Sequence, residues 1–273
     1  MVASMSEDEL SRIDQYLDQV PRSAALTEEI GPFTLFVGQP HGWRYYGRPR
    51  FALDEEITRR DVERLVERQR ELTVPEAIEG LADQTPSLAP ACQAVGLAVE
   101  ELPLLIHRSP QHAPAPDGVR IRRLDPDDVA VSASQVVATL GFESAGTDIA
   151  PVGPTERNEM LRTRDQDSDA LVRDRIARDV SVLFVAEDEL GVVASGMHQP
   201  VDDVTEIVGV ATLPTMRRRG LAGALTADLV LDAQRRGVSL CFLTAGSTEI
   251  ARVYERIGFR RAGTAIAASL ASG

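Results

Sequence analysis

Segments of strand character and segments of helix character alternate along residues 119–270, and this alternation restricts the fold of the 273-residue chain more than any other feature. Apolar runs typical of strands occupy residues 119–124, 181–187, 192–201, 205–213, 238–244 and 261–270. Helix-like segments occupy residues 127–140, 158–179, 221–235 and 247–257, the first of them expected to end at Gly141. A loop rich in glycine and proline is expected at residues 143–156. Strands that alternate with helices after a hairpin predict a mixed α/β sheet.

A proline-rich segment at residues 107–118 divides the chain. Prolines at this spacing disfavour a helix and stiffen the backbone, as in a linker. The chain is also longer than one typical domain of about 150 residues. We therefore predict two domains, at residues 1–112 and 116–273.

The overall charge and the cysteine content exclude several classes of protein. Acidic residues number 42 and basic residues 29, and the net charge of −13 disfavours nonspecific binding to nucleic acid or anionic lipid. No apolar run approaches the ~18 residues of a membrane helix, and the N-terminus lacks the pattern of a signal peptide. Cys92 and Cys241 are too few for a disulfide scaffold or a zinc site, so we expect a cytoplasmic protein without metal.

A strand, a short loop and a helix follow one another in residues 213–225. The N-terminus of a helix has unpaired N–H groups and the positive end of the dipole, and it therefore attracts phosphate. Small residues let a pyrophosphate approach this helix start, and they are Gly220, Ala222 and Gly223. Arginines can bind phosphate through two hydrogen bonds, and three precede the helix, Arg217, Arg218 and Arg219. The alternative is a solvated basic turn, and the spacing fits neither a Walker loop nor a dinucleotide fingerprint.

Two motifs in this half resemble those of one enzyme family. Arg217-x-x-Gly220-x-Ala222, between a strand and a helix, resembles the acetyl-CoA signature of the GNAT superfamily of N-acetyltransferases, Gln/Arg-x-x-Gly-x-Gly/Ala. The family's later motif, Asn-x-x-Ala-x-x-x-Tyr-x-x-x-Gly-Phe, is similar to Ser247, Ile250, Tyr254, Gly258 and Phe259. Ser247 and Ile250 depart from its Asn and Ala. The resemblance covers residues 119–270 and implies a mixed, mostly antiparallel sheet flanked by helices.

The resemblance implies acetyl-CoA as cosubstrate and assigns it a binding site. In the family, the strand that contains Gly209 separates from its neighbour to admit the pantetheine arm, and the N–H of Val210 would face the thioester oxygen. Glycine inside a strand often marks a bulge or a close backbone approach, whereas simple packing is the alternative. The residues so assigned are Val210, Ala211, Thr212, Arg217, Arg218, Arg219, Gly220, Leu221, Ala222, Gly223 and Ser247.

Glu206 is the candidate general base. It lies on the strand of residues 205–213, where the even positions 206, 208, 210 and 212 are expected to share one face. In the family, a glutamate at this point of the strand often acts as base through a water molecule. A free amine has a pKa near ~10, so a base or relay is needed at neutral pH. A surface glutamate at a strand end is the alternative.

Tyr254 is the candidate acid that protonates the leaving CoA thiolate, a role that the family match implies. A buried tyrosine is more often a core residue whose hydroxyl has one partner, and that interpretation stays open. Ser247 lies where the family has asparagine, and capping of the helix is by itself enough to explain a serine there.

His198 is a second candidate base. If the hairpin turns at residues 202–204, Pro200 pairs with Glu206, and His198 then shares a sheet face with this glutamate. Its unperturbed pKa near ~6.5 suits proton transfer, although a packed or hydrogen-bonded histidine is the alternative. The other histidines, His41, His107 and His112, have no ligand-like neighbours in the sequence, and Cys241 is expected in the core.

The first half repeats the element order of residues 221–270 in a degenerate form. A helix is expected at residues 61–72, followed by a strand, a short helix, Gly96 and a further strand. Cys92 stands where the second half has Tyr254, and no Arg-x-x-Gly-x-Gly/Ala loop precedes the helix. We therefore expect an inactive GNAT-like half. Its aromatic segment either lines an acceptor pocket or packs in the core, and comprises Trp43, Tyr45 and Tyr46.

The predicted function is acetyl transfer from acetyl-CoA to a primary amine by direct attack, with Glu206 as base and Tyr254 as acid. The acceptor would be a small molecule or a peptide. A non-catalytic protein that binds or senses acyl-CoA is the alternative, but it has no need of both residues. Neither nucleic acid nor a membrane is expected as partner, and the sequence is compatible with a homodimer.

Overall fold

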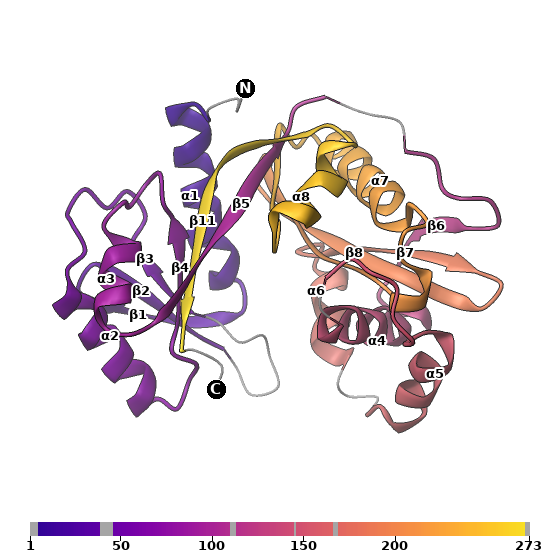
Figure 1. Cartoon of the computed structure of the whole chain (residues 1–273), viewed down its shortest axis with the longest axis horizontal. Coiled ribbons are helices and arrows are strands. Elements are labelled where there is room, and N and C mark those ends of the chain that lie inside the picture. Colours follow the sequence, from indigo (N-terminus) through magenta and orange to yellow (C-terminus); the bar gives the residue numbers. More distant parts are fainter. Residues whose placement is uncertain (1–4, 39–45, 110–112, 145, 166–168, 271–273) are drawn as a thin grey trace. The chain divides into compact units, whose positions relative to one another are not determined.

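A computed structural model describes residues 5–38, 46–109, 113–144, 146–165 and 169–270 (Figure 1). The chain forms two compact units. The first comprises residues 1–104, 244–246 and 261–273, and the second comprises residues 105–243 and 247–260. Among the described residues, no helix combines the length and the apolar character that crossing a bilayer requires.

The first unit is a sheet with helices on both faces. Its elements are α1 (Glu7–Arg22), β1 (Ala25–Ile30), β2 (Phe33–Gly38), β3 (Gly47–Pro49), α2 (Arg59–Glu71), β4 (Ala77–Leu81), α3 (Leu88–Ala94), most of β5 (Ala98–His107) and most of β11 (Phe259–Ser269). The strand order is β1-β2-β3-β4-β11-β5. Strand β1 was not predicted, because half of its sequence ALTEEI is polar and none of its side chains is fully buried.

Neighbouring residues of β3 show how the faces of this sheet are covered. A Cβ on Gly47 would meet Leu65 of α2. The face of the sheet on which Gly47 lies is therefore the one that packs on α2 and α3, with the apolar core between them. The next residue, Arg48, points to the other face, as alternation along a strand requires. There its buried guanidinium forms an ion pair with Asp14 of α1 at 2.5 Å.

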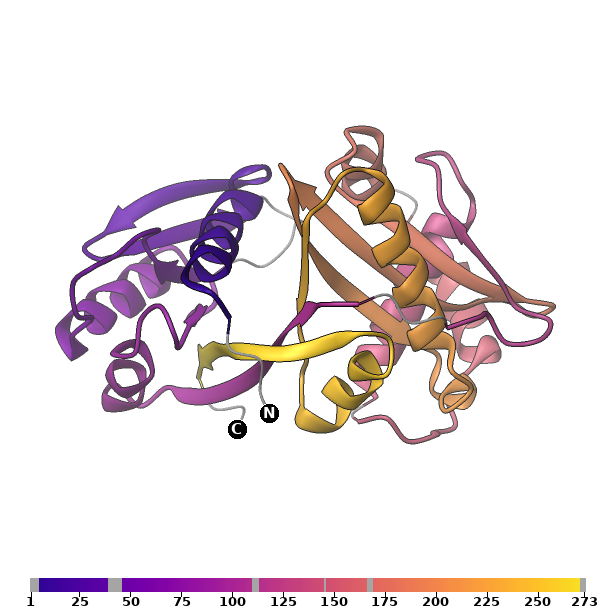
Figure 2. The same ribbon diagram turned by 90° about the horizontal axis from the view of Figure 1, so that it is seen from above.

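The last strand of the chain belongs to the first unit (Figure 2). Residues 265–269 of β11 pair antiparallel with residues 77–81 of β4. Ile266 and Ala268 are buried in the core that α2 and α3 cover, and this apolar burial stabilises the pairing. The compact units are therefore not continuous in sequence, whereas the linker at residues 107–118 suggested a continuous second domain.

The second unit is a five-stranded sheet between two helical layers. It contains β6 (Arg120–Arg123), α4 (Ala130–Glu143), α5 (Pro154–Thr163), α6 (Ala170–Ala177), β7 (Val182–Asp188), β8 (Gly191–Val201), β9 (Val204–Thr212), a short 3-10 helix (Pro214–Met216), α7 (Leu221–Arg235), β10 (Leu240–Thr244) and α8 (Thr248–Glu255). The strand order is β10-β9-β8-β7-β6, and only the β9–β10 pair is parallel. The predicted mixed, mostly antiparallel sheet is confirmed.

Helix α4 continues past Gly141, where the sequence predicted its end. A Cβ at this position would lie 2.9 Å from the Cβ of Ala211 on β9. The glycine therefore permits close packing of the helix on the sheet and is not a stop signal.

The two halves repeat one element order, as predicted. Elements α2, β4, α3 and β5 correspond to α7, β10, α8 and β11. The glycine after the short helix has a positive φ in both halves, 86° at Gly96 and 101° at Gly258.

Candidate active site

A β-bulge at Gly209 shapes the central strand β9. Met197 of β8 pairs with Val208, and Ser195 pairs with Ala211, so Gly196 lies opposite two residues. Gly209 has φ of 65°, the left-handed conformation that glycine adopts without steric cost. The sequence-based suggestion of a bulge at this glycine is thus confirmed.

The bulge reverses the faces of the residues that follow it. The hydroxyl of Ser195, the partner of Ala211, donates to the carbonyl of Ser134 on α4 at 3.0 Å, so this pair faces α4. A Cβ on Gly196 would lie 3.1 Å from Val210 and 3.3 Å from Leu225 of α7, so Val210 faces α7. The two faces of the sheet are therefore covered by α4 and α7.

Glu206 lies before the bulge and on the α4 face. It pairs with Gln199, which is four residues after Ser195 on β8 and thus on the same side. The expectation that positions 206, 208, 210 and 212 share one face is wrong, because the extra residue at Gly209 inverts the alternation. Glu206 and Val208 face α4, whereas Val210 and Thr212 face α7.

Strand β9 separates from β10 directly after Glu206. The parallel pairing ends at Glu206 and Phe242, although β9 continues to Thr212. Backbone groups of Val210, Ala211 and Thr212 are thereby left without a strand partner on this side. The hydroxyl oxygen of Thr212 is buried and has no hydrogen-bond partner within the described part of the chain. The open edge thus offers unused polar groups to a ligand.

The start of α7 has unpaired amides. Among the described residues, no N–H from Arg218 to Gly223 donates a hydrogen bond, and the first helical bond joins the N–H of Ala224 to the carbonyl of Gly220. Gly220 begins the helix with φ of 82° and has no side chain to cap it. A Cβ on Gly223 would meet only Ile257, at 3.6 Å. Six consecutive amides at the positive end of a helix dipole form an anion site.

Helix α8 provides the second element of the site. The Ser247 hydroxyl caps the helix by accepting from the N–H of Ile250 at 3.1 Å. Tyr254 is buried, and its ring packs edge-to-face on Phe259 with centroids 6.1 Å apart. Its hydroxyl has no hydrogen-bond partner among the described residues. Burial raises the pKa of the Tyr254 phenol to about 12, so it remains protonated at neutral pH.

Comparison with known proteins connects this geometry to a family. The family model of the acetyltransferase (GNAT) domain matches residues 179–261. Residues 179–261 are a GNAT acetyltransferase domain. No curated protein matches the chain.

Solved structures extend the GNAT likeness over the whole chain. A GCN5-related N-acetyltransferase from Kribbella flavida is 19% identical with a TM-score of 0.69, covering 97% of this chain and 96% of its own. A GCN5-related N-acetyltransferase-like protein from Streptococcus suis is 12% identical with a TM-score of 0.59, covering 96% and 98%. A tandem GNAT protein from the clavulanic acid biosynthesis pathway is 12% identical with a TM-score of 0.54, covering 100% and 98%. At these identities the likeness establishes the fold, which is that of a tandem GNAT protein.

Arg217, the first residue of the GNAT signature, points away from the free amides. Its Nη1 donates to the carbonyl of Asp148 at 3.0 Å, and its Nη2 donates to the carbonyls of Gly141 and Ser144 at 2.8 and 2.7 Å. The sequence predicted a phosphate contact for this side chain, and the structure uses it at the end of α4 instead. The signal was ambiguous, because a helix C-terminus attracts arginine as phosphate does.

Arg218 and Arg219 remain near the start of α7 in the GNAT domain. Their closest carboxylates are Asp148 and Asp188, each at 3.9 Å, and both arginine side chains are substantially exposed. Nη1 of Arg219 also lies 3.3 Å from the sulfur of Met216. These long ion pairs are weak, so both cations are available to an anion.

His198 is not on the same face as Glu206. The hairpin turns at Asp202 and Asp203, so His198 pairs with Ile207. It does not pair with Val208, which lies on the same face as Glu206. This two-residue turn shifts the register by one position relative to the prediction and places His198 on the α7 face. The predicted assistance to Glu206 therefore lacks its geometric basis.

His198 instead links the sheet to α7. Its imidazole is fully buried, with Nδ1 3.1 Å from the hydroxyl of Thr205 and Nε2 3.0 Å from the carboxylate of Asp232. Burial lowers the pKa of His198 below its ordinary value, although Asp232 opposes the shift. Asp232 also accepts from Arg236 at 2.6 Å. No signal in the sequence connected Asp232 to a histidine 34 residues away.

Neither cysteine is an exposed thiol. Cys92 and Cys241 are free and buried, and burial raises the pKa of both thiols. Among the described residues, no group of three side chains suited to a metal ion occurs. Four residues named from the sequence lie outside the described residues, His41, Trp43, Tyr45 and His112. Tyr46 packs edge-to-face on Phe36, with centroids 6.3 Å apart.

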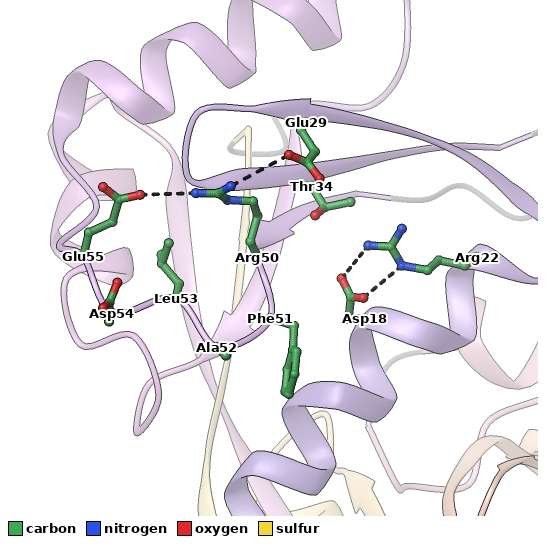
Figure 3. Close-up of a pocket in the computed structure, with 10 residues that line it drawn as sticks. All are labelled: Asp18, Arg22, Glu29, Thr34, Arg50, Phe51, Ala52, Leu53, Asp54 and Glu55. Atoms are coloured by element: carbon green, nitrogen blue, oxygen red, sulfur yellow. Dashed lines mark hydrogen bonds and ion pairs between the residues drawn. The ribbon is translucent and has the colours of Figure 1, made fainter.

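A polar pocket of about 420 Å³ lies in the first unit (Figure 3). Both of its arginines form ion pairs with carboxylates of the same wall, as Figure 3 shows. Arg22 binds Asp18 at 2.9 Å, and Arg50 lies 3.4 Å from Glu55. Both of its cations are thus paired within the wall, and we assign the pocket no part in the GNAT site.

Proposed function

We propose that the GNAT domain transfers an acetyl group from acetyl-CoA to a primary amine. The observation that carries this proposal is the row of free amides from Arg218 to Gly223 beside the open edge of β9. A pyrophosphate fits the amides, because Gly220 and Gly223 have no side chains and their Cβ positions are nearly free. A pantetheine arm fits the unpaired edge of Val210–Thr212, where it would reach the orphaned hydroxyl of Thr212.

The chemistry requires removal of one proton and supply of another. The amine nitrogen attacks the carbonyl carbon of the thioester and forms the C–N bond, while the C–S bond breaks. Glu206 accepts the amine proton through a water molecule, and the Val210 N–H stabilises the developing oxyanion. Tyr254 donates its proton to the CoA thiolate, which leaves as the thiol. In favour of this role, the phenol is protonated at neutral pH, and no described residue forms a hydrogen bond with its hydroxyl.

Two measurements test the proposal. Calorimetry with acetyl-CoA should show binding, and a free-thiol assay with a panel of primary amines should show CoA release that depends on both substrates. Binding of acetyl-CoA without turnover on any amine, together with unchanged binding and CoA release in Tyr254→Phe, would instead favour a sensor of acyl-CoA.

Two variants separate the catalytic roles on the best acceptor of the panel. Tyr254→Phe should lower kcat by about 10²- to 10³-fold, and Glu206→Gln by about 10²-fold, because each removes one proton-transfer group. The acetyl-CoA affinity should stay within about 2-fold in both. A matched control is Glu189→Gln in an exposed turn, which should turn over normally. An unchanged pH–rate profile in Glu206→Gln would place the base elsewhere.

A further inference from the structure

The loop after α4 is attached by main-chain and side-chain contacts to residues 214–217, which precede the free amides at the start of α7. Arg217 contributes three hydrogen bonds, all to carbonyl groups at the end of α4 and in this loop. The N–H of Thr215 donates to the carbonyl of Val152 at 3.0 Å, and the N–H of Ala150 donates to that of Pro214 at 3.4 Å. Residues 146–153 therefore follow any movement of residues 214–217.

The same loop also contacts α8. The hydroxyl of Thr147 donates to the carboxylate of Glu249, in the first turn of the helix that carries Tyr254. The segment before α7 thus holds both ends of the loop, and α8 holds Thr147 between them. These are the two elements that provide the free amides and the phenol of the proposed site.

Arg217 is the residue through which a ligand at the amides can affect the loop. It directly precedes Arg218, the first of the residues with free amides, and Arg218 has φ of 66° without being a glycine. Such a conformation is uncommon and persists only where its surroundings hold it. An anion bound to the amides of residues 218–223 fixes these dihedral angles, and the guanidinium is then held where it meets the three carbonyls.

We infer that Arg217 is a positioning residue that couples the acetyl-CoA site to residues 146–153, so that cofactor binding orders this loop before the acceptor binds. The inference rests on the proposed function. Two large apolar side chains that flank the contact are mostly exposed, Phe142 and Ile149, each at 64%. Coupling of this kind is reciprocal, so whatever fixes the loop also favours acetyl-CoA.

Hydrogen exchange of the full-length protein, with and without saturating acetyl-CoA, tests the inference. In the wild type, acetyl-CoA should slow exchange by at least about 10-fold both in residues 218–223 and in residues 146–153. In Arg217→Gln, the protection of residues 218–223 should persist at saturation, while that of residues 146–153 falls below about 2-fold. The KM for the best acceptor should rise about 10-fold in this variant, with kcat nearly unchanged.

Two further variants make the test decisive. Arg219→Gln removes an equivalent charge without a contact to the loop, so residues 146–153 should remain protected at saturating acetyl-CoA. Arg217→Lys keeps the charge but cannot reach three carbonyls, and it provides the same comparison if Arg217→Gln does not fold. Equal protection of residues 146–153 in wild type and Arg217 variants would overturn the coupling alone. No protection of residues 218–223 in the wild type would overturn the acetyl-CoA site and the coupling with it.

Discussion

Helices α2 and α7 occupy the same place in the two halves of the chain, but they begin in opposite ways. Helix α2 starts with a capping box, in which the N–H of Thr58 donates to the Asp61 carboxylate at 2.9 Å and the N–H of Asp61 donates to the Thr58 hydroxyl at 3.4 Å. Helix α7 starts at Gly220 with no capping side chain and six free amides. The first helix start is satisfied by its own side chains, and the second is open to water or an external anion.

The electrostatics of the two helix starts differ in the same sense. Burial raises the pKa of Asp61, but hydrogen bonds from Thr58 and Arg64 outweigh it and lower the pKa overall, so the carboxylate is charged at neutral pH. A phosphate there would meet a negative charge and occupied amides. The start of α7 has arginines nearby and no carboxylate in its first turn. The start of α2 is thus capped and negatively charged, whereas the start of α7 is neither.

The short helices that follow differ as well. Cys92 of α3 is fully buried in the apolar core of the first unit, and burial raises its pKa to about 12. Tyr254 of α8 is also buried, but it has a hydroxyl with no partner among the described residues. Among the described residues, the proposed anion site and proton donor thus occur together in the second half, and the first half is expected to be inactive.

The largest expected effect comes from transferring the acid of α2 to α7. Gly223 occupies the third helical position, as Asp61 does, and a Cβ there meets only Ile257 at 3.6 Å. Gly223→Asp should weaken acetyl-CoA binding by at least about 100-fold, or ~2.7 kcal/mol, because the carboxylate occupies the amides and repels phosphate. The Tm should stay equal or rise. Calorimetry measures the affinity, and Gly223→Asn controls for bulk; equal losses in both variants would show that charge is not the cause.

A charge reversal beside the free amides should have the next largest effect. Arg219→Glu should weaken acetyl-CoA binding by about 1–3 kcal/mol, because charge-assisted contacts to phosphate are lost. Arg235→Glu makes the same change at the other end of α7 and should leave the affinity nearly unaltered. Calorimetry that shows no change for Arg219→Glu would remove this residue from the site.

Removal of the α2 cap should lower stability without touching the ligand site. Thr58→Ala leaves the N–H of Asp61 uncapped and should cost about 1 kcal/mol in the free energy of unfolding. Ser247→Ala removes the equivalent cap of α8 and should cost a similar amount. Denaturant titration measures both losses. Only Ser247→Ala should also weaken acetyl-CoA binding, and equal affinities in the two variants would confine Ser247 to capping.

The smallest effect concerns pH, and it should arise in the second unit, which holds both described histidines, His107 and His198. Burial is the largest cause of the lowered pKa in each, so the unfolded chain binds the proton first as pH falls. The stability from His198 is complete above about pH 6.5 and declines below it, by at most about 0.7 kcal/mol between pH 7 and 6. His198→Gln should flatten this part of the stability curve measured by denaturant titration. A slope that stays the same would mean that His198 keeps an ordinary pKa when folded.

Local signals were enough to predict most of the elements and the strand, loop and helix that form the candidate site. The start of α7 at Leu221 follows from a glycine after three arginines, and its end at Arg235 from the glycine that follows. The bulge at Gly209 was also readable, because a glycine inside a strand has few other uses. The direction of side chains around these elements could not be predicted equally well.

The sequence by itself determined where most strands and helices lie, that α7 begins after a strand without a capping side chain, and which residues could exchange protons. The tertiary structure alone decided which way these groups point and with what they pair. A two-residue turn placed His198 on the α7 face, one extra residue at Gly209 inverted the faces beyond it, and packing of α4 drew Arg217 to its carbonyls. Helix caps and glycine conformations depend on a few neighbouring residues, so they can be predicted from the sequence. The register of a strand, the face of a side chain and its partner depend on contacts between distant segments. A shift of one residue in register moves a side chain to the opposite face of the sheet.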